Sequence, residues 1–283
     1  MNWYIYYRGP LGSCNYGCSY CPFSKRTNTL SELKDDFDKL DRFTEWVSVQ
    51  KYGIRVLFTP WGEALIHPAY QKALIELSHL PHLQEVAIQT NLSGKLDWIA
   101  NVNPHKMSLW ATYHPSETDR SEFLERCFWL RSQGIAFSVG VVGKREHFDE
   151  IEALRRMLPD TYYLWVNAFD DDPSYYTGEE IKRLERYDPL FPVNVKRYPS
   201  LGRACYAGET AFTVDGNGDV RRCHFIHKVI GNIYEDDFSS ALKPKVCTNE
   251  TCSCHIGYVH LKELQLYERF GNRLAGRIPL GYT

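Results

Sequence analysis

Residues 14–21 read Cys-Asn-Tyr-Gly-Cys-Ser-Tyr-Cys and place Cys14, Cys18 and Cys21 at C-x3-C-x2-C spacing near the start of the chain. Three thiolates at this spacing can hold three irons of a 4Fe–4S cluster from one short loop. The loop has no fourth cysteine, so the fourth iron would be open to another ligand. The alternatives are three buried thiols or a zinc site, although zinc usually takes four ligands in two separated pairs. We therefore expect a cluster with an open iron.

Short apolar runs alternate with amphipathic segments from the first residues to about residue 199. The expected strands are residues 3–7, 56–59, 86–89, 108–112, 137–142 and 162–166, and the expected helices are residues 30–49, 68–78, 96–100, 121–132 and 148–157. This α/β alternation predicts a parallel sheet with right-handed crossovers. Six such units fit a partial (β/α)6 TIM-like barrel, because a closed eightfold barrel usually takes ~250 residues.

The composition changes after residue 199, so we expect a barrel over 1–199 and a small cysteine-rich β-hairpin/helix extension over 200–283. A turn signal at 215–218 predicts a hairpin over 210–222, which would bring Cys205 and Cys223 together. Cys247, Cys252 and Cys254 follow, before a predicted helix over 261–270. Five cysteines thus compete for four metal positions, and a zinc knuckle that uses His224, His227 or His255 is the alternative.

Composition narrows the class of partner. The net charge of −2 gives no basic field, so a nucleic-acid partner is not expected. The first residues lack the basic and apolar runs of a signal peptide, and no stretch approaches the ~20 apolar residues of a membrane span. We therefore expect no membrane association and a cytoplasmic location, where nine cysteines indicate metal binding.

Polar residues follow the predicted strand ends, where such barrels place their chemistry. Trp61-Gly62-Glu63 follows the second strand, and the later strand ends carry Thr90, Asn91, Thr112 and His114. A proton-transfer role for His114 competes with a purely structural one. Cys127 lies between apolar residues of a predicted helix and is expected in the core.

The cysteine loop, with aromatic Tyr20 before its last cysteine, resembles that of the radical SAM (S-adenosylmethionine) superfamily. The resemblance implies that the open iron chelates the methionine moiety of the cofactor, which one electron cleaves to a 5′-deoxyadenosyl radical. Gly62-Glu63 resembles the glycine–glycine–glutamate motif that binds the methionine amino group, although Trp61 replaces the first glycine and Ala64 a common proline.

The same resemblance assigns further cofactor contacts. It implies a backbone contact of Tyr20 with adenine, roles of Thr90, Asn91 and Thr112 towards the ribose, the carboxylate or the substrate, and an apolar contact of Gly140 and Val142 with adenine. Residues 200–283 resemble a twitch domain, in which four cysteines hold a second, auxiliary 4Fe–4S cluster.

These motifs, together with Ala-Thr-Tyr-His-Pro (111–115) and the Cys-Ser-Cys-His tail, look like a group of short bacterial radical SAM proteins without an assigned substrate. The implied activity is oxidation or modification of a substrate, a peptide in preference to a small molecule. The implied electron donor is a flavodoxin or ferredoxin. A non-catalytic zinc or iron–sulfur scaffold is the competing hypothesis.

Overall fold

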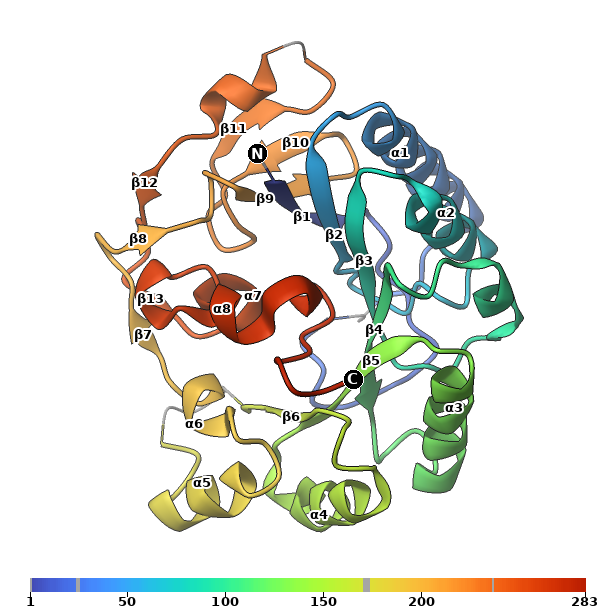
Figure 1. Ribbon diagram of the computed structural model, residues 1–283, viewed down its shortest axis with the longest axis vertical. Helices are drawn as coiled ribbons and strands as arrows, with labels where there is room; N and C mark the ends of the chain where they lie inside the picture. The colour runs from blue at the N-terminus through green and yellow to red at the C-terminus, as the bar shows by residue number, and fades with distance from the viewer. Residues whose placement is uncertain (1, 24–25, 170–173, 236) are drawn as a thin grey trace.

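The computed structural model describes residues 2–23, 26–169, 174–235 and 237–283. Its centre is a curved nine-stranded sheet in the order β11-β10-β9-β1-β2-β3-β4-β5-β6 (Figure 1). Neighbouring strands from β1 to β6 are parallel, which confirms the predicted parallel sheet; their bounds are Asn2–Arg8, Gly53–Phe58, Leu83–Thr90, Met107–Tyr113, Ala136–Val142 and Leu164–Asn167. Within the described residues β11 and β6 are the two edges of this open sheet.

Helices cover the convex face of this sheet (Figure 1). Local sequence explains their starts: Thr29 and Glu32 form a capping box, and Asp119 accepts a hydrogen bond from the Ser121 amide. Four helices confirm predicted ones: α1 (Leu30–Ser48), α2 (Pro68–His79), α3 (Arg120–Ser132) and α4 (Phe148–Met157). The fifth predicted helix is instead a 3-10 turn, η1 (Asp97–Asn101), and η2 (Arg145–His147) precedes α4. Two helices after β6 were not predicted: α5 (Gly178–Glu185) and α6 (Phe191–Asn194).

The chain beyond residue 199 continues the sheet. β9 (Ala211–Asp215) pairs in parallel with β1, and β10 (Asp219–Arg221) turns back against β9 through Gly218 at φ 87°. The predicted hairpin is therefore present, and β11 (Val229–Asn232) pairs with its second strand. The sheet therefore continues across residue 199, and the division of the chain into 1–199 and 200–283 stays a prediction.

Two small ladders connect the remaining cysteine-bearing segments. β8 (Ala204–Cys205) pairs with β12 (Lys245–Val246), and β7 (Tyr198–Pro199) pairs with β13 (Thr251–Cys252). A 3-10 turn, η3 (Phe238–Ala241), lies between β11 and β12. The second pairing places Cys252 beside Tyr198, at the end of the predicted barrel region.

The C-terminal segment fills the concave side of the sheet (Figure 1). Inward-facing side chains of the strands, such as Tyr6 and Trp110, form one apolar cluster with residues of α7 (His255–Tyr258) and α8 (Leu266–Phe270). The predicted helix over 261–270 is wrong in its extent, because Gln265 adopts φ 50° and separates η4 (Lys262–Leu264) from α8. A further turn, η5 (Gly271–Arg273), follows α8.

Candidate functional site

The cysteine loop leaves the end of β1 and is fixed by polar contacts at its start. The Asn28 side-chain oxygen accepts hydrogen bonds from the amides of Gly12 and Ser13, at 2.7 and 2.8 Å. Cys18 is buried, whereas Cys14 and Cys21 are partly exposed. Burial raises the pKa of the Cys18 thiol to about 11. The backbone is thus fixed immediately before Cys14, the first of the three cysteines.

Gly62 lets the Trp-Gly-Glu loop lie directly against the cysteine loop. A Cβ atom on Gly62 would stand 1.7 Å from the Ser13 carbonyl oxygen, so only glycine fits this approach. The Glu63 amide donates to the same oxygen at 3.1 Å. The two motifs singled out in the sequence are therefore in direct backbone contact, one residue before Cys14.

Glu63 is buried and ties the second strand end to the third. Its carboxylate accepts hydrogen bonds from the Leu65 amide at 3.0 Å, the Thr90 hydroxyl at 2.8 Å and the Asn91 amide at 2.6 Å. Burial raises its pKa to about 7, and these three hydrogen bonds oppose that rise. None of the ion pairs among the described residues involves Glu63.

Asn91 extends this network to the first cysteine. Its side-chain nitrogen lies 3.1 Å from the Asn15 side-chain oxygen and 3.8 Å from the Cys14 sulfur. Asn15 Nδ2 in turn donates to the Ser93 hydroxyl at 2.9 Å. Residues that follow β3 therefore contact the loop that the sequence predicts to hold the cluster.

His114 follows β4 and contacts the same loop at two other residues. Its Nδ1 lies 3.0 Å from the Tyr20 hydroxyl and 3.4 Å from the Cys18 sulfur. Burial lowers its pKa to about 4, so the imidazole is neutral near pH 7. His114 thus supports the cysteine loop, and its proton-transfer role stays a prediction.

The remaining predicted cofactor contacts lie at or near the same strand ends. Thr112 pairs with Gly140 in the β4–β5 register, and Val142 ends β5. A Cβ atom on Gly140 would overlap the Trp165 indole at 1.9 Å, so that ring occupies the place of a side chain there. Contacts of these three residues with adenine, ribose or substrate stay predictions.

Arg222 connects the chain segments that carry the second group of cysteines. Its guanidinium donates to the carbonyl oxygens of Ala207 and Lys245, at 3.0 and 2.9 Å, and thereby joins the hairpin end to the β8–β12 ladder. Cys205 and Cys223 lie at this junction, and the Cys247 amide donates to the Arg203 carbonyl at 2.9 Å. The predicted meeting of Cys205 and Cys223 is thus consistent with the strand pairing.

The thiols of the second cysteine group lie close enough to influence one another's pKa values. The pKa of Cys252 is raised by burial first, and then by the neighbouring thiols of Cys223, Cys254, Cys247 and Cys205. Cys254 also affects the pKa of Arg8, which burial lowers to about 10, and that of Tyr6, which burial raises. Cys254 thus lies towards the concave side of the sheet.

Two of the three histidines of the zinc alternative, His224 and His255, contact other side chains. The His255 ring packs edge-on against Trp110 and Phe270, and His224 Nε2 lies 3.0 Å from the Thr59 hydroxyl. Within the described ranges, no three Cys, His, Asp or Glu side chains converge on a single-ion site. The same part of the chain has no helix long and apolar enough to cross a membrane.

Sequence reasoning missed Arg8, the last residue of β1. Its Nε donates to the Thr59 carbonyl at 2.6 Å, and its guanidinium lies 4.1 Å above the Trp61 ring. Side chains alternate along a strand, so the inward-facing Tyr4 and Tyr6 place Arg8 on the concave face as well. That alternation is the signal that could have revealed it.

Solved structures with the same fold bind S-adenosylmethionine (AdoMet). Native anSMEcpe with bound AdoMet and the Cp18Cys peptide has a TM-score of 0.55 and 13% identity over 97% of this chain and 98% of that chain. The structure with AdoMet and the Kp18Cys peptide has a TM-score of 0.58 at 12% identity over the same shares. The form with AdoMet alone has a TM-score of 0.55 and 13% identity over 97% and 100%. No protein-family model and no curated protein matches the chain.

Proposed function

We propose that this protein is a radical SAM enzyme that abstracts a hydrogen atom from its substrate. One observation carries the proposal: the cysteine loop, the Gly62–Glu63 loop and Asn91 form one hydrogen-bonded unit at the carboxyl ends of parallel strands. Three thiols without a fourth in the loop suit a cluster with an open iron. The fold shared with AdoMet-bound anSMEcpe supports the same conclusion.

The first cluster would be held by Cys14, Cys18 and Cys21. When bound, it supplies the electron that splits SAM into methionine and a 5′-deoxyadenosyl radical. Glu63 suits the methionine ammonium, because its buried carboxylate receives only neutral donors and has a raised pKa. A cation beside it would stabilise the ionised form and add a charge-assisted hydrogen bond.

A second cluster would be held by Cys205, Cys223, Cys247 and Cys252. The pKa of Cys252 reflects the proximity of Cys223, Cys254, Cys247 and Cys205, which supports a cluster held by four of these five thiols. Cys254 would be the spare thiol, because it is exposed and also lies near Arg8 and Tyr6. The second cluster would accept the electron of the oxidised substrate or bind the substrate directly.

The substrate class that we favour is a peptide. The neighbour anSMEcpe has been solved with two peptides bound, and it matches this chain over nearly its whole length. A flavodoxin or ferredoxin would deliver the first electron. Oxidation of a small molecule remains the alternative substrate class.

Anaerobic reconstitution tests the proposal against a scaffold role. The enzyme should bind about eight irons, as two 4Fe–4S clusters require. With dithionite and SAM it should release 5′-deoxyadenosine. A colourless protein that binds zinc and leaves SAM intact would overturn the proposal.

A further inference from the structure

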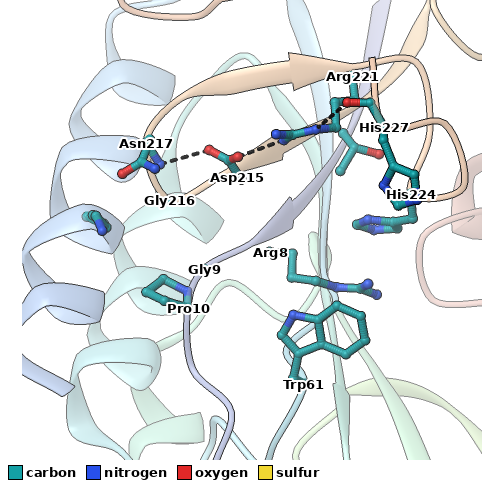
Figure 2. A pocket seen from close by; sticks show the side chains of 12 residues that line it. Arg8, Gly9, Pro10, Trp61, Asp215, Gly216, Asn217, Arg221, His224 and His227 are labelled. Carbon is teal, nitrogen blue, oxygen red and sulfur yellow. Dashed lines mark hydrogen bonds and ion pairs between the residues drawn. The ribbon is translucent and has the colours of Figure 1, made fainter. Parts of the chain in front are cut away.

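A cavity of about 440 Å³ opens between β1, the β9–β10 hairpin and the Trp61 loop. Figure 2 shows Arg8 and Trp61 on one side of it, with Asp215, Arg221 and His224 across from them. The cavity lies at the carboxyl ends of two parallel strands, because β1 ends at Arg8 and β9 at Asp215. Parallel sheets bind their ligands at this edge.

The lysine and arginine side chains that line the cavity wall differ in whether they form ion pairs. Arg221 forms an ion pair with Asp215 at 2.6 Å, and Lys39 forms one with Asp35 at 2.6 Å. No ion pair among the described residues involves Arg8, which contacts the Thr59 carbonyl and the Trp61 ring and also lies near the Cys254 thiol. Asp215, the only carboxylate among the described lining residues, is therefore already neutralised, and the lining keeps an excess of positive charge.

The contacts of Arg8 orient its guanidinium. Hydrogen bonding through Nε and stacking on the indole fix the plane of the group, and they leave both terminal nitrogens as donors. Two parallel donors in one plane match the two oxygens of a carboxylate. Burial lowers the pKa of Arg8 only to about 10, so it stays charged at neutral pH.

The cavity also adjoins both proposed clusters. Trp61, on its wall, directly precedes Gly62-Glu63 of the cofactor motif, and His224 directly follows Cys223 of the second cysteine group. A molecule in this cavity would lie beside the SAM-binding loop and the auxiliary group at once. That position suits a substrate rather than a remote effector.

We propose that Arg8 and Trp61 form an anion site that anchors a carboxylate of the substrate, such as an acidic side chain or the C-terminus of a peptide. The site explains the departure at position 61, since the indole that replaces glycine supports the guanidinium. A carboxylate is favoured over a phosphate dianion because, among the described lysine and arginine side chains of the lining, Arg8 alone has no ion pair, which matches one negative charge. This inference rests on the proposed function for the identity of the ligand as substrate.

Chemical protection of Arg8 tests the site without a known substrate. Phenylglyoxal, which modifies accessible guanidinium groups, would be applied to the reconstituted protein, and modification of each arginine would be followed by peptide mass spectrometry. The probes are N-acetylglycine, its neutral amide, and inorganic phosphate. Arg131 is the matched control, because its guanidinium also faces a tyrosine ring but lies on an exposed helix position outside the cavity.

N-acetylglycine at ~50 mM should slow modification of Arg8 roughly threefold, as a dissociation constant of about 25 mM implies, and leave Arg131 unaffected. The amide should protect neither residue. Equal protection by the amide, better protection by phosphate, or an Arg8 that never reacts would each overturn the carboxylate site.

The same preparation would be assayed for 5′-deoxyadenosine, so that the two proposals can fail separately. SAM cleavage without protection of Arg8 would overturn the anion site alone. Protection without SAM cleavage would leave an anion site but overturn its assignment to the substrate of a radical SAM enzyme.

Discussion

Replacing Gly62 by alanine should displace the cysteine loop. The new methyl carbon would stand 1.7 Å from the Ser13 carbonyl oxygen and 2.4 Å from its carbon, where an ordinary contact is at least 3.4 Å. Both atoms belong to the backbone, so no side-chain rotation relieves the overlap. Either the loop that carries Cys14 or the Gly62–Glu63 backbone must therefore move by more than about 1 Å.

Two contributions should lower the free energy of unfolding. Overpacking in a closely packed site costs about 1–3 kcal/mol, and loss of the 3.1 Å Glu63–Ser13 hydrogen bond adds about 1 kcal/mol. A total of about 2–4 kcal/mol should lower the apparent unfolding temperature by about 4–8 °C in a chain of this size. Because the displaced backbone adjoins Cys14, we also expect lower iron incorporation at the first site.

Circular dichroism melting of the metal-free protein and iron analysis after reconstitution measure these effects. Gly17→Ala is the matched control, since Gly17 lies in the same loop and a Cβ there meets nothing within 4 Å. It should melt and load iron like the wild type. A Gly62→Ala protein that also does so would refute the backbone contact between the two motifs.

Two further predictions concern the second cysteine group and a buried acid. Cys252→Ser should remove about one 4Fe–4S cluster, about four irons, whereas Cys254→Ser should keep both; the reverse iron contents would exchange the two assignments. Burial raises the pKa of Asp36 from 3.8 to about 6, so the folded state holds a proton that the unfolded state has lost, and stability should fall as pH rises from 4 to 6. Asp36→Asn should remove at most about 3 kcal/mol of this dependence, whereas the exposed Asp38→Asn should not; parallel melting curves against pH for wild type and Asp36→Asn would contradict the assignment.

Local sequence patterns predicted strands β1–β6 and helices α1–α4, because a continuous apolar run indicates a strand buried on both faces and helical spacing indicates one buried helix face. They also predicted the hairpin at Gly218, since its positive φ requires glycine or a similar residue. The extent of the last helix was mispredicted. Packing into the concave side of the sheet breaks it at Gln265, and a local pattern contains no information on that packing.

The site could be predicted in part for the same reason. Motif spacing indicated the cysteine loop and Glu63, whereas the donors that surround Glu63 come from another strand end. The Arg8 cavity could not be predicted, because it exists only where β9 pairs with β1, two strands about 200 residues apart in the chain. Non-local pairing of this kind is not encoded in the periodicity of either strand.

Cofactor cleavage by a variant without the three loop thiols tests the central claim most directly. In Cys14→Ala/Cys18→Ala/Cys21→Ala, 5′-deoxyadenosine formation should vanish and iron should fall by about four per chain, with the second cluster retained. Cys127→Ala, which removes a thiol buried in α3, should keep both clusters and the activity. Undiminished 5′-deoxyadenosine formation by the triple variant would contradict the radical SAM mechanism.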